Sequence, residues 1–259
     1  MDLSGQVVLV TGAGQGIGKA CALAMAKVGA DVATVDINSE SVKETADAIA
    51  ALGRRSLALR ADLGSVAEID RMIGETIAAF GRIDTLVNNA GVTRRADIMD
   101  LTEDDWDRTH RVNAKGVFFC LQRAAREMIP RRSGRIINIA SIAGKGYSGT
   151  SNAIYAASKG AVISLTKTAA QQLGPYNINV NAVCPGIVRT AMWREINRIV
   201  AEKEGRSPEE VEASKLETVP LRRANEPEDI ADMVVFLASA GSRNVTGQAF
   251  NVDGGLVPH

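Results

Sequence analysis

Tyr155 and Lys159 are the pair of residues in this sequence with the clearest capacity for chemistry. On a helix, residues four apart lie on the same face, so the ammonium group would stand beside the phenol. A phenol alone titrates near pH ~10, and a nearby positive charge lowers that pKa. Such a tyrosine can exchange a proton with a reacting hydroxyl or carbonyl group. An ordinary surface helix is the alternative for this pair taken alone.

A second candidate is the glycine-rich stretch TGAGQGIG at residues 11–18, between an apolar run at 7–10 and a helical pattern at 17–28. A strand, a glycine turn and a helix N-terminus together bind the pyrophosphate of a dinucleotide. A flexible loop without a ligand is the alternative. The turn predicts cofactor contacts from Gly12, Gln15, Gly16, Ile17 and Gly18, the last glycine also letting the helix pack close to the strand.

Asp36 ends the next predicted strand, 18 residues after Gly18, close to the spacing of ~20 in dinucleotide sites. A carboxylate there accepts hydrogen bonds from the adenosine ribose hydroxyls and repels a 2′-phosphate. Ile37 follows, where an NADP site often has a basic residue, so both residues predict NAD. A helix N-cap is the alternative role for Asp36, although Asn38 or Ser39 could serve as well.

The apolar pattern predicts the scaffold that must position these residues. Short strands alternate with helices of about 12 to 15 residues, which indicates a Rossmann-like α/β fold: a doubly wound parallel sheet of about seven strands with helices on both faces. We find no repeat or linker, so residues 1–259 are predicted to form a single domain. A polar, helical stretch at 190–218 interrupts the alternation and is predicted to be a substrate lid.

Composition excludes several other classes of protein. Lys plus Arg equals Asp plus Glu, 30 each, so the chain has no basic footprint for nucleic acid. Three cysteines form no C-x-x-C pair and His110 is isolated, so neither a disulfide framework nor a metal site is predicted. Without an apolar run of about 18 residues or a signal peptide, we expect a soluble, cytoplasmic protein with no membrane partner.

Four motifs together resemble the short-chain dehydrogenase/reductase family. They are the glycine turn, Asp62-Leu63, the sequence NNAG at 88–91 and Tyr-x-x-x-Lys at 155–159, and their order and spacing match over residues 3–255. The resemblance implies that Asp62 and Leu63 contact the adenine and that Asn89 and Gly91 line the cofactor. It also implies that Asn88 ties adjacent strands together.

The resemblance implies four catalytic residues: Asn113, Ser141, Tyr155 and Lys159. Asn113 would distort its helix and hold a water that links Lys159 to solvent, although a buried structural Asn is the alternative. Ser141 would donate a hydrogen bond to a substrate oxygen, and Lys159 would lower the pKa of Tyr155 and bind the nicotinamide ribose. Ser141 precedes Tyr155 by 14 residues, about one more than is common in the family, and the loop 145–152 could absorb the extra residue.

The segment after the sixth predicted strand resembles the family's Pro-Gly loop. Pro185 and Gly186 would line the cofactor, Val188 would meet the nicotinamide carboxamide, and Thr190 the amide or a phosphate. Residues 184–193 look like those of acetoin/butanediol and polyol dehydrogenases. Met192 and Trp193 are the predicted substrate contacts.

These features predict an NAD-dependent oxidoreductase that interconverts a secondary alcohol and a ketone of polyol, diol or hydroxyketone type. The resemblance suggests a homotetramer built on the long helices that bear Asn113 and Tyr155. One alternative is a 3-oxoacyl-[acyl-carrier-protein] reductase, which would usually use NADP. Another is a nucleotide-sensing binding protein, which would be expected to lack Ser141, Tyr155 or Lys159. A nucleotide-sugar epimerase would need a larger carboxy-terminal domain.

Overall fold

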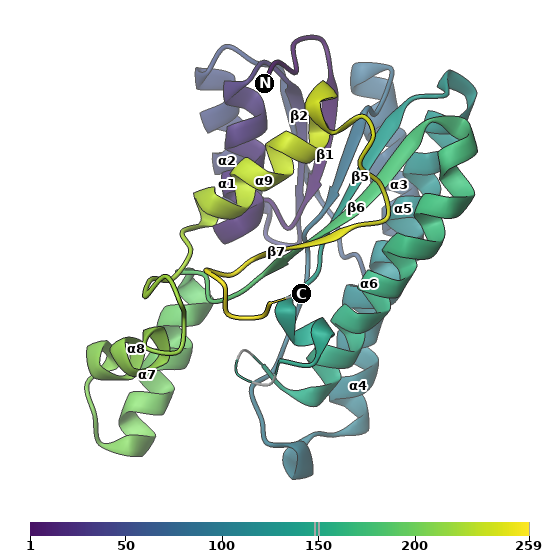
Figure 1. The fold of residues 1–259 in the computed structure, drawn as a ribbon. Coiled ribbons are helices and arrows are strands. Elements are labelled where there is room, and N and C mark those ends of the chain that lie inside the picture. The colour runs from purple at the N-terminus through teal and green to yellow at the C-terminus, as the bar shows by residue number, and fades with distance from the viewer. Residues whose placement is uncertain (148, 150, 259) are drawn as a thin grey trace.

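Seven parallel strands form one sheet between two layers of helices (Figure 1). The computed structural model describes residues 1–147, 149 and 151–258, except for the side chain of Met192. The strand order is β3-β2-β1-β4-β5-β6-β7, which confirms the predicted doubly wound sheet. The strands are β1 (Val7–Thr11), β2 (Asp31–Asp36), β3 (Ser56–Arg60), β4 (Thr85–Asn88), β5 (Gly134–Ile139), β6 (Ile178–Pro185) and β7 (Ala249–Val252).

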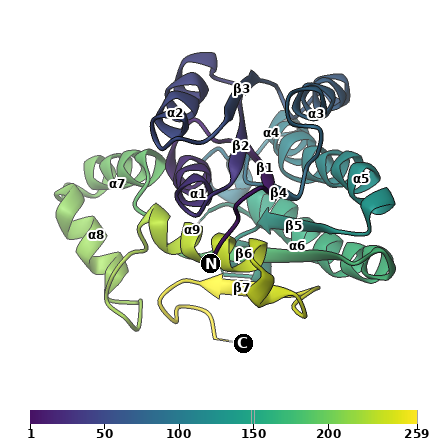
Figure 2. The same cartoon turned by 90° about the horizontal axis from the view of Figure 1, so that it is seen from above.

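The helices cover both faces of this sheet (Figure 2). One layer holds α1 (Gly16–Lys27), α2 (Ser39–Ala51) and α9 (Pro227–Ala238), and the other α3 (Val66–Phe80), α5 (Val117–Met128) and α6 (Ala153–Leu173). Alternate side chains of β1 pack against the two helix layers. Val8 and Val10 belong to the core beside α1 and α9, and Leu9 belongs to the core beside α3 and α5. Burial on both sides accounts for the continuous apolar strands.

Side-chain caps fix where several helices begin. The Asn38 side chain accepts hydrogen bonds from the backbone N–H groups of Glu40 and Ser41 at the start of α2. Asn38, rather than Asp36, is therefore the N-cap residue of this helix. At the start of α6, the Asn152 side chain accepts from the backbone N–H of Tyr155 at 2.8 Å, which anchors the helix that carries Tyr155 and Lys159.

The long helix expected to bear Asn113 is not regular. It consists of α4 (Glu103–His110), a π-helical segment (Arg111–Gly116) and α5. The helical distortion expected around Asn113 is therefore present, because a π-helical segment shifts the backbone hydrogen bonds from i+4 to i+5 partners. At its end, Gly116 packs so closely on β3–α3 that a Cβ atom would lie 2.6 Å from the Leu63 carbonyl oxygen.

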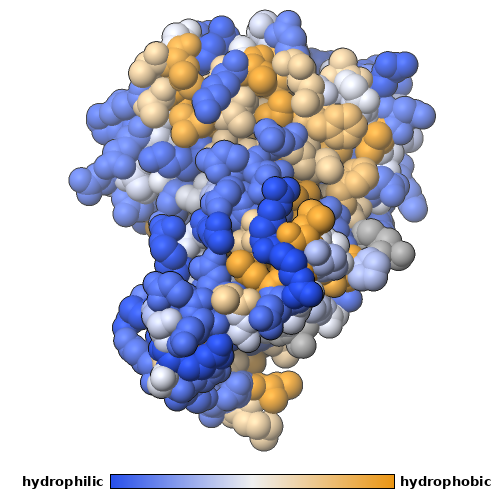
Figure 3. Space-filling view, turned by 60° about the vertical axis from the view of Figure 1, so that its left-hand side comes forward, coloured by the Kyte–Doolittle hydropathy of each residue, from blue (hydrophilic) through white to orange (hydrophobic). Residues whose placement is uncertain are grey.

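The stretch predicted to be a lid forms α7 (Ala191–Glu204) and α8 (Pro208–Leu216), which project beside the sheet edge in Figure 1. Hydrophilic side chains cover most of their surface in Figure 3. Arg189 joins this unit to the body: its guanidinium contacts Glu212 of α8 at 2.7 Å and Glu226, the residue before α9, at 3.0 Å. Within the described residues, no helix combines the length and apolarity that crossing a membrane requires.

Candidate active site

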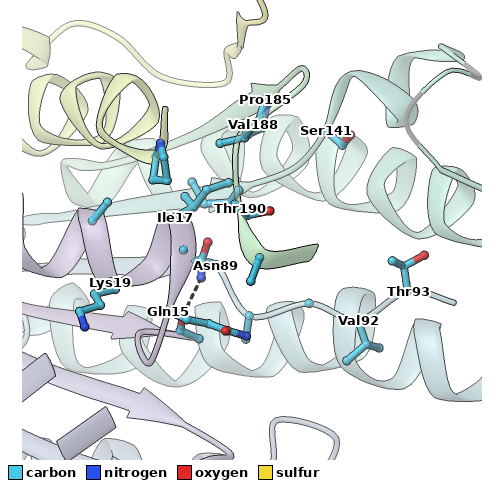
Figure 4. A pocket seen from close by; sticks show the side chains of 18 of the residues that line it. Gln15, Ile17, Lys19, Asn89, Val92, Thr93, Ser141, Pro185, Val188 and Thr190 are labelled. Carbon is cyan, nitrogen blue, oxygen red and sulfur yellow. Dashed lines mark hydrogen bonds between the residues drawn. The ribbon is translucent and has the colours of Figure 1, made fainter. Parts of the chain in front are cut away.

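A cavity of about 910 Å³ opens where the carboxyl ends of β1, β4, β5 and β6 meet, and Figure 4 shows residues from these elements around it. This is the point at which the strand order reverses, where open α/β sheets bind ligands. Most predicted site residues line the cavity: Gly12, Gln15, Gly16, Ile17, Asp36, Asp62, Leu63, Asn89, Gly91, Ser141, Tyr155, Lys159, Pro185, Gly186, Val188, Thr190 and Trp193. The structure therefore brings together residues that are far apart in the sequence.

Gly18, also predicted to contact the cofactor, does not line this cavity, and its contact with a cofactor remains a prediction. A Cβ atom at Gly18 would lie 2.0 Å from the Gly12 carbonyl oxygen, so this glycine allows α1 to pack against the turn. Gly12 (φ +63°) and Gly16 (φ +53°) adopt left-handed conformations that favour glycine. The Asn89 amide donates to the carbonyl oxygens of Thr11 and Gly12, both at 3.0 Å, and so holds the turn against the end of β4.

Asp36 lies at the end of β2, where the glycine turn fixes its carboxylate. One carboxylate oxygen accepts a hydrogen bond from the Gly14 backbone N–H at 2.9 Å, and the other accepts from Asn38 N–H at 3.1 Å. Asp36 forms no ion pair with any described residue, so its negative charge is not cancelled by a neighbouring cation. The exposed Ile37 adds no positive charge beside it.

Ser141 and Tyr155 reach the cavity from β5 and α6. Ser141 is 5% exposed, and its hydroxyl oxygen accepts a hydrogen bond from the Ala143 backbone N–H at 3.1 Å, which leaves the hydroxyl proton to donate elsewhere. Tyr155 is half-buried. Burial raises the pKa of Tyr155 to about 12, against the lowering effect of a hydrogen bond with the Ser141 side chain.

Lys159 is buried beneath Tyr155, with its Nζ atom 5.7 Å from the centre of the phenol ring. The ammonium donates a hydrogen bond to the Ile139 carbonyl oxygen at 2.7 Å. Burial lowers the pKa of Lys159 to about 8, while the nearby Cys184 acts in the opposite direction. Burial is the largest influence on the phenol, and the lowering of the Tyr155 pKa by Lys159 remains a prediction.

Asn113 does not line the cavity. Its side chain is fully buried and forms hydrogen bonds with other protein groups. Its amide oxygen accepts from Val92 N–H at 2.8 Å, and its amide nitrogen donates to the Val92 carbonyl at 2.9 Å and to Ser158 Oγ at 3.1 Å. Asn113 thus connects the π-helical segment, the loop after β4 and α6. A water relay through Asn113 remains a prediction.

Asn88 ties strands together, as expected. Its amide nitrogen donates to Asn138 Oδ1 at 2.9 Å, and the Asn138 amide donates to Thr166 Oγ1, also at 2.9 Å. This buried chain of hydrogen bonds crosses from β4 through β5 to α6. It joins α6, the helix that carries Tyr155 and Lys159, to the middle of the sheet.

Trp193 belongs to both the cavity wall and a small apolar cluster with Ile187, Val219 and Ala224. It is 8% exposed, so it forms a floor rather than a protruding contact. The side chain of Met192, also predicted to contact substrate, lies outside the described part of the chain. Ser148 and Thr150, in the loop predicted to absorb an extra residue, lie outside it as well.

Several residues that line the cavity are not among the predicted site residues. Thr93 and Ser151 form a hydroxyl pair, with their Oγ atoms 3.0 Å apart, and both line the cavity. Arg194 also lines it and forms no ion pair with the described carboxylates, unlike Arg189. The sequence contains a feature that could have predicted Arg194 as a site residue. Arg194 follows Thr190, the N-cap residue of α7, by four residues, so the two lie on the same side of this helix.

Comparisons with known proteins give the following results. The model of a protein family described as Enoyl-(Acyl carrier protein) reductase matches residues 12–257. The chain is 42% identical over 255 residues to the (2S)-[(R)-hydroxy(phenyl)methyl]succinyl-CoA dehydrogenase subunit BbsD of Thauera aromatica, covering 98% of each chain. It is 40% identical over 258 residues to the 3-oxoacyl-[acyl-carrier-protein] reductase FabG of Thermotoga maritima, covering 99% of this chain and 100% of the relative.

Solved structures match over the same length. An NAD⁺-bound xylitol dehydrogenase superposes with a TM-score of 0.92 at 36% identity, covering 98% of this chain and 100% of the other. A short-chain type dehydrogenase/reductase from Mycobacterium marinum gives a TM-score of 0.90 at 35% identity, covering 100% of this chain and 98% of the other. The same fold and the same extent of chain are thus shared with these proteins.

Proposed function

The chain belongs to the short-chain dehydrogenase/reductase family of oxidoreductases, which use a nicotinamide cofactor, and from this premise we propose that it interconverts a secondary alcohol and a ketone with NAD. The observation that carries the proposal is one cavity lined by Asp36 and the glycine turn at one end and by Ser141, Tyr155 and Lys159 at the other. The first group fits a dinucleotide, and the second fits proton exchange at an oxygen atom.

The residues at the nucleotide end have the features that a dinucleotide requires. Gly16 leaves a space in which a Cβ atom would lie 3.4 Å from the Thr190 side chain, so the α1 N-terminus and Thr190 face the same point. Backbone N–H groups of Gly16 and Ile17 would hold the pyrophosphate there. Arg194, on the same helix face as Thr190, would add a positive charge. Asp36 would bind the adenosine ribose hydroxyls and exclude a 2′-phosphate.

At the reacting end, each of three side chains has a distinct task. In alcohol oxidation the deprotonated oxygen of Tyr155 would take the proton of the substrate hydroxyl and become a hydroxyl, and the Ser141 hydroxyl would donate a hydrogen bond to the substrate oxygen as it becomes a carbonyl. NAD, when bound, accepts the hydride and adds a positive ring charge, which lowers the pKa of a neighbouring acid. Lys159 supplies a second positive charge behind the phenol and binds the nicotinamide ribose.

The cofactor assignment is tested by titrating the protein with NADH and NADPH and comparing kcat/KM for NAD and NADP in a screen of alcohols and ketones. We expect NAD to be preferred, and Asp36→Ser to reduce the preference by raising the affinity for NADPH. Asp47→Ser is the matched control and should leave the preference unchanged, since Asp47 is an exposed aspartate of α2 that does not line the cavity. Equal kcat/KM for the two cofactors in the wild type would contradict the role of Asp36.

A 3-oxoacyl-[acyl-carrier-protein] reductase remains the second candidate, because relatives of that name are 40% identical over almost the whole chain. The uncompensated charge of Asp36 favours the first candidate, since that reductase would usually use NADP. Turnover of an acyl-carrier-protein thioester with NADPH, in the absence of turnover of small alcohols with NAD, would favour the second.

A further inference from the structure

A pair of hydroxyl groups lines the cavity where the loop after β4 meets the start of α6. Thr93 Oγ1 and Ser151 Oγ lie 3.0 Å apart, and either oxygen can be the donor of the hydrogen bond between them. Both side chains are partly buried. Neither hydroxyl forms a further hydrogen bond with any residue that the structure describes. The fold therefore leaves part of the hydrogen-bonding capacity of this pair unused in the cavity wall.

The loop that carries Thr93 runs past the reacting end of the cavity. A Cβ atom at Gly91, two residues before Thr93, would lie 3.6 Å from Lys159 Nζ, so the loop packs directly beside this ammonium. In Figure 4, Thr93 lies toward the side of the cavity that holds Ser141, away from Gln15 of the glycine turn. The Thr93 hydroxyl thus belongs to the part of the cavity where the substrate would react, rather than to the nucleotide end.

Ser151 reaches the pair from the start of α6. It directly precedes Asn152, the N-cap residue, whose side chain accepts a hydrogen bond from the backbone N–H of Tyr155 at 2.8 Å. Ser151 therefore lies within about one helical turn of Tyr155. The Asn152 amide also donates to the Arg94 carbonyl, so a second hydrogen bond joins the loop to the start of this helix. These contacts hold the hydroxyl pair close to the catalytic tyrosine of the proposed function.

The hydrogen-bonding capacity of the pair decides which chemical group it can bind. Each hydroxyl has one proton to donate and two lone pairs that accept. The bond between Thr93 and Ser151 uses one proton, so the other proton and free lone pairs remain. A neutral hydroxyl group both donates and accepts, and can therefore use both. A carbonyl or ether oxygen only accepts, and a carboxylate would find no positive charge on the pair.

We propose that Thr93 and Ser151 bind a second hydroxyl group of the substrate, on a carbon close to the reacting one, and so determine specificity for diols, polyols and hydroxyketones over simple alcohols and ketones. The inference rests on the proposed function and names the substrate class for the same site. Ser141 and Tyr155 would bind the reacting oxygen. The second hydroxyl would donate to one member of the pair and accept from the other.

The test compares alcohols that differ only at the second oxygen. 2,3-Butanediol and 2-butanol share a carbon skeleton and differ by one hydroxyl, and 3-methoxy-2-butanol keeps the second oxygen without its proton. The formation of NADH gives kcat/KM for each alcohol. We expect the wild type to prefer the diol to both other alcohols by about tenfold or more, because a site that binds a substrate hydroxyl discriminates against analogues that lack it.

Thr93→Val keeps the shape of the side chain and removes its hydroxyl, and Ser151→Ala removes the other hydroxyl. Each should reduce the ratio of kcat/KM for the diol to that for 2-butanol by about tenfold, since only the diol loses a hydrogen bond. A merely structural defect would lower both values and leave their ratio unchanged. Thr93→Ser retains a hydroxyl and should restore most of the ratio. Thr168→Val, on an exposed threonine of α6 that does not line the cavity, is the matched control.

NADH affinity, measured on the same proteins by the fluorescence of the bound cofactor, separates this inference from the proposed function. Equal kcat/KM for the diol and for 2-butanol in the wild type would overturn the hydroxyl-binding role while the proposed function stands. A diol preference that Thr93→Val and Ser151→Ala leave unchanged would do the same. Absence of NADH binding, or of turnover of every alcohol and ketone, would count against the proposed function and would remove the inference with it.

Discussion

Tyr155 and Lys159 lie one turn apart on α6, and both reach the cavity, but their electrostatics oppose the simplest mechanism. Burial raises the pKa of the phenol to about 12 and lowers that of the amine to about 8. Burial disfavours the charged form of each group, so the protein alone holds the phenol protonated. On the proposed function, the positive charge of a bound nicotinamide ring together with Lys159 would lower the pKa of Tyr155 toward neutral pH.

Tyr155→Phe tests this role directly. Without the hydroxyl, proton exchange at the substrate oxygen is lost, and we expect kcat to fall by about 10²–10⁴-fold, the usual contribution of general acid–base catalysis. NADH affinity should stay within a factor of about two, because backbone groups and Asp36 hold the nucleotide. Tyr176→Phe, on an exposed tyrosine beyond the end of α6, is the control. Turnover like that of the wild type in Tyr155→Phe would end the assignment.

Lys159 gives a prediction for stability as a function of pH. Below pH about 8 the folded and the unfolded chain both carry this proton, and above ~10.4 neither does. Between these values only the unfolded chain binds it, so the free energy of unfolding of the wild type rises with pH across this window. Lys159→Met lacks the proton. The Tm of the wild type relative to that of the variant should therefore rise by roughly 5 °C from pH 8 to 10.5.

Differential scanning fluorimetry of the two proteins over this pH range makes the measurement. Other titrating groups are shared by the two proteins, so their effects cancel in the difference. Lys167→Met, on an exposed lysine of the same helix, controls for the loss of a charge in itself. A Tm difference that stays constant between pH 8 and 10.5 would show that the folded-state pKa of Lys159 is not lowered.

At the scale of elements, close packing of α1 on the glycine turn sets the shape of the nucleotide end. Gly18 faces the Gly12 carbonyl and the Asn89 amide. A Cβ atom at Gly18 would lie only 2.0 Å from the Gly12 carbonyl oxygen and 2.4 Å from Asn89 Nδ2. The π-helical segment has a comparable role at the other end, where Asn113 fastens Val92 and Ser158. Both contacts shape the cavity without lining it.

Gly18→Ala should therefore destabilise the protein by about 1–3 kcal/mol or more, because the backbone must move to admit the methyl group. NADH affinity should fall as well, since the turn that holds the pyrophosphate is displaced. Gly74→Ala is the matched control: Gly74 lies within α3 and a Cβ atom there meets nothing within 4 Å. Alanine should stabilise that helix by about 1 kcal/mol. Urea unfolding measures both variants, and equal effects would contradict the packing argument.

At the scale of the whole molecule, α7 and α8 form the predicted lid, which meets the body through the apolar cluster around Trp193 and through ion pairs of Arg189. Arg189 connects α8 and the start of α9 to the loop that follows β6, by ion pairs with Glu212 and Glu226. Such exposed pairs contribute little to global stability. Because they lie where the predicted lid joins the body, we expect them to limit how far α7 and α8 can move from the cavity.

Arg189→Gln is expected to change the free energy of unfolding by less than about 1 kcal/mol, as for exposed ion pairs in general. Amide hydrogen exchange in α7 and α8 should nevertheless become faster, and KM for the substrate should rise more than kcat falls. Arg198→Gln is the control, because Arg198 pairs with Glu195 and Glu202 inside α7 and holds nothing across the lid. Unchanged exchange in Arg189→Gln would show that the lid is held by other contacts.

Much of the fold and of the candidate site could be predicted from the sequence, because the features concerned are local. Strand and helix periodicities place the elements to within a few residues, as for β1 and α1. The glycine turn, Asp36 and Ser141 each follow a strand, and parallel strands end at one edge of the sheet, so their meeting at a cavity follows from the pattern alone.

The tertiary structure decided what those residues are bound to. Lys159 donates a hydrogen bond to the carbonyl of Ile139 on β5. The side chain of Asn113 forms hydrogen bonds with Val92 and Ser158. The ammonium of Lys215 packs on the ring of Trp193. Each of these contacts joins residues that no local periodicity relates. The direction in which a pKa shifts depends on the burial of the group and on its hydrogen-bond and charge partners. The same holds for whether a charged side chain forms an ion pair and for whether Gly18 lines the cavity. Burial and partners arise only when distant segments pack together.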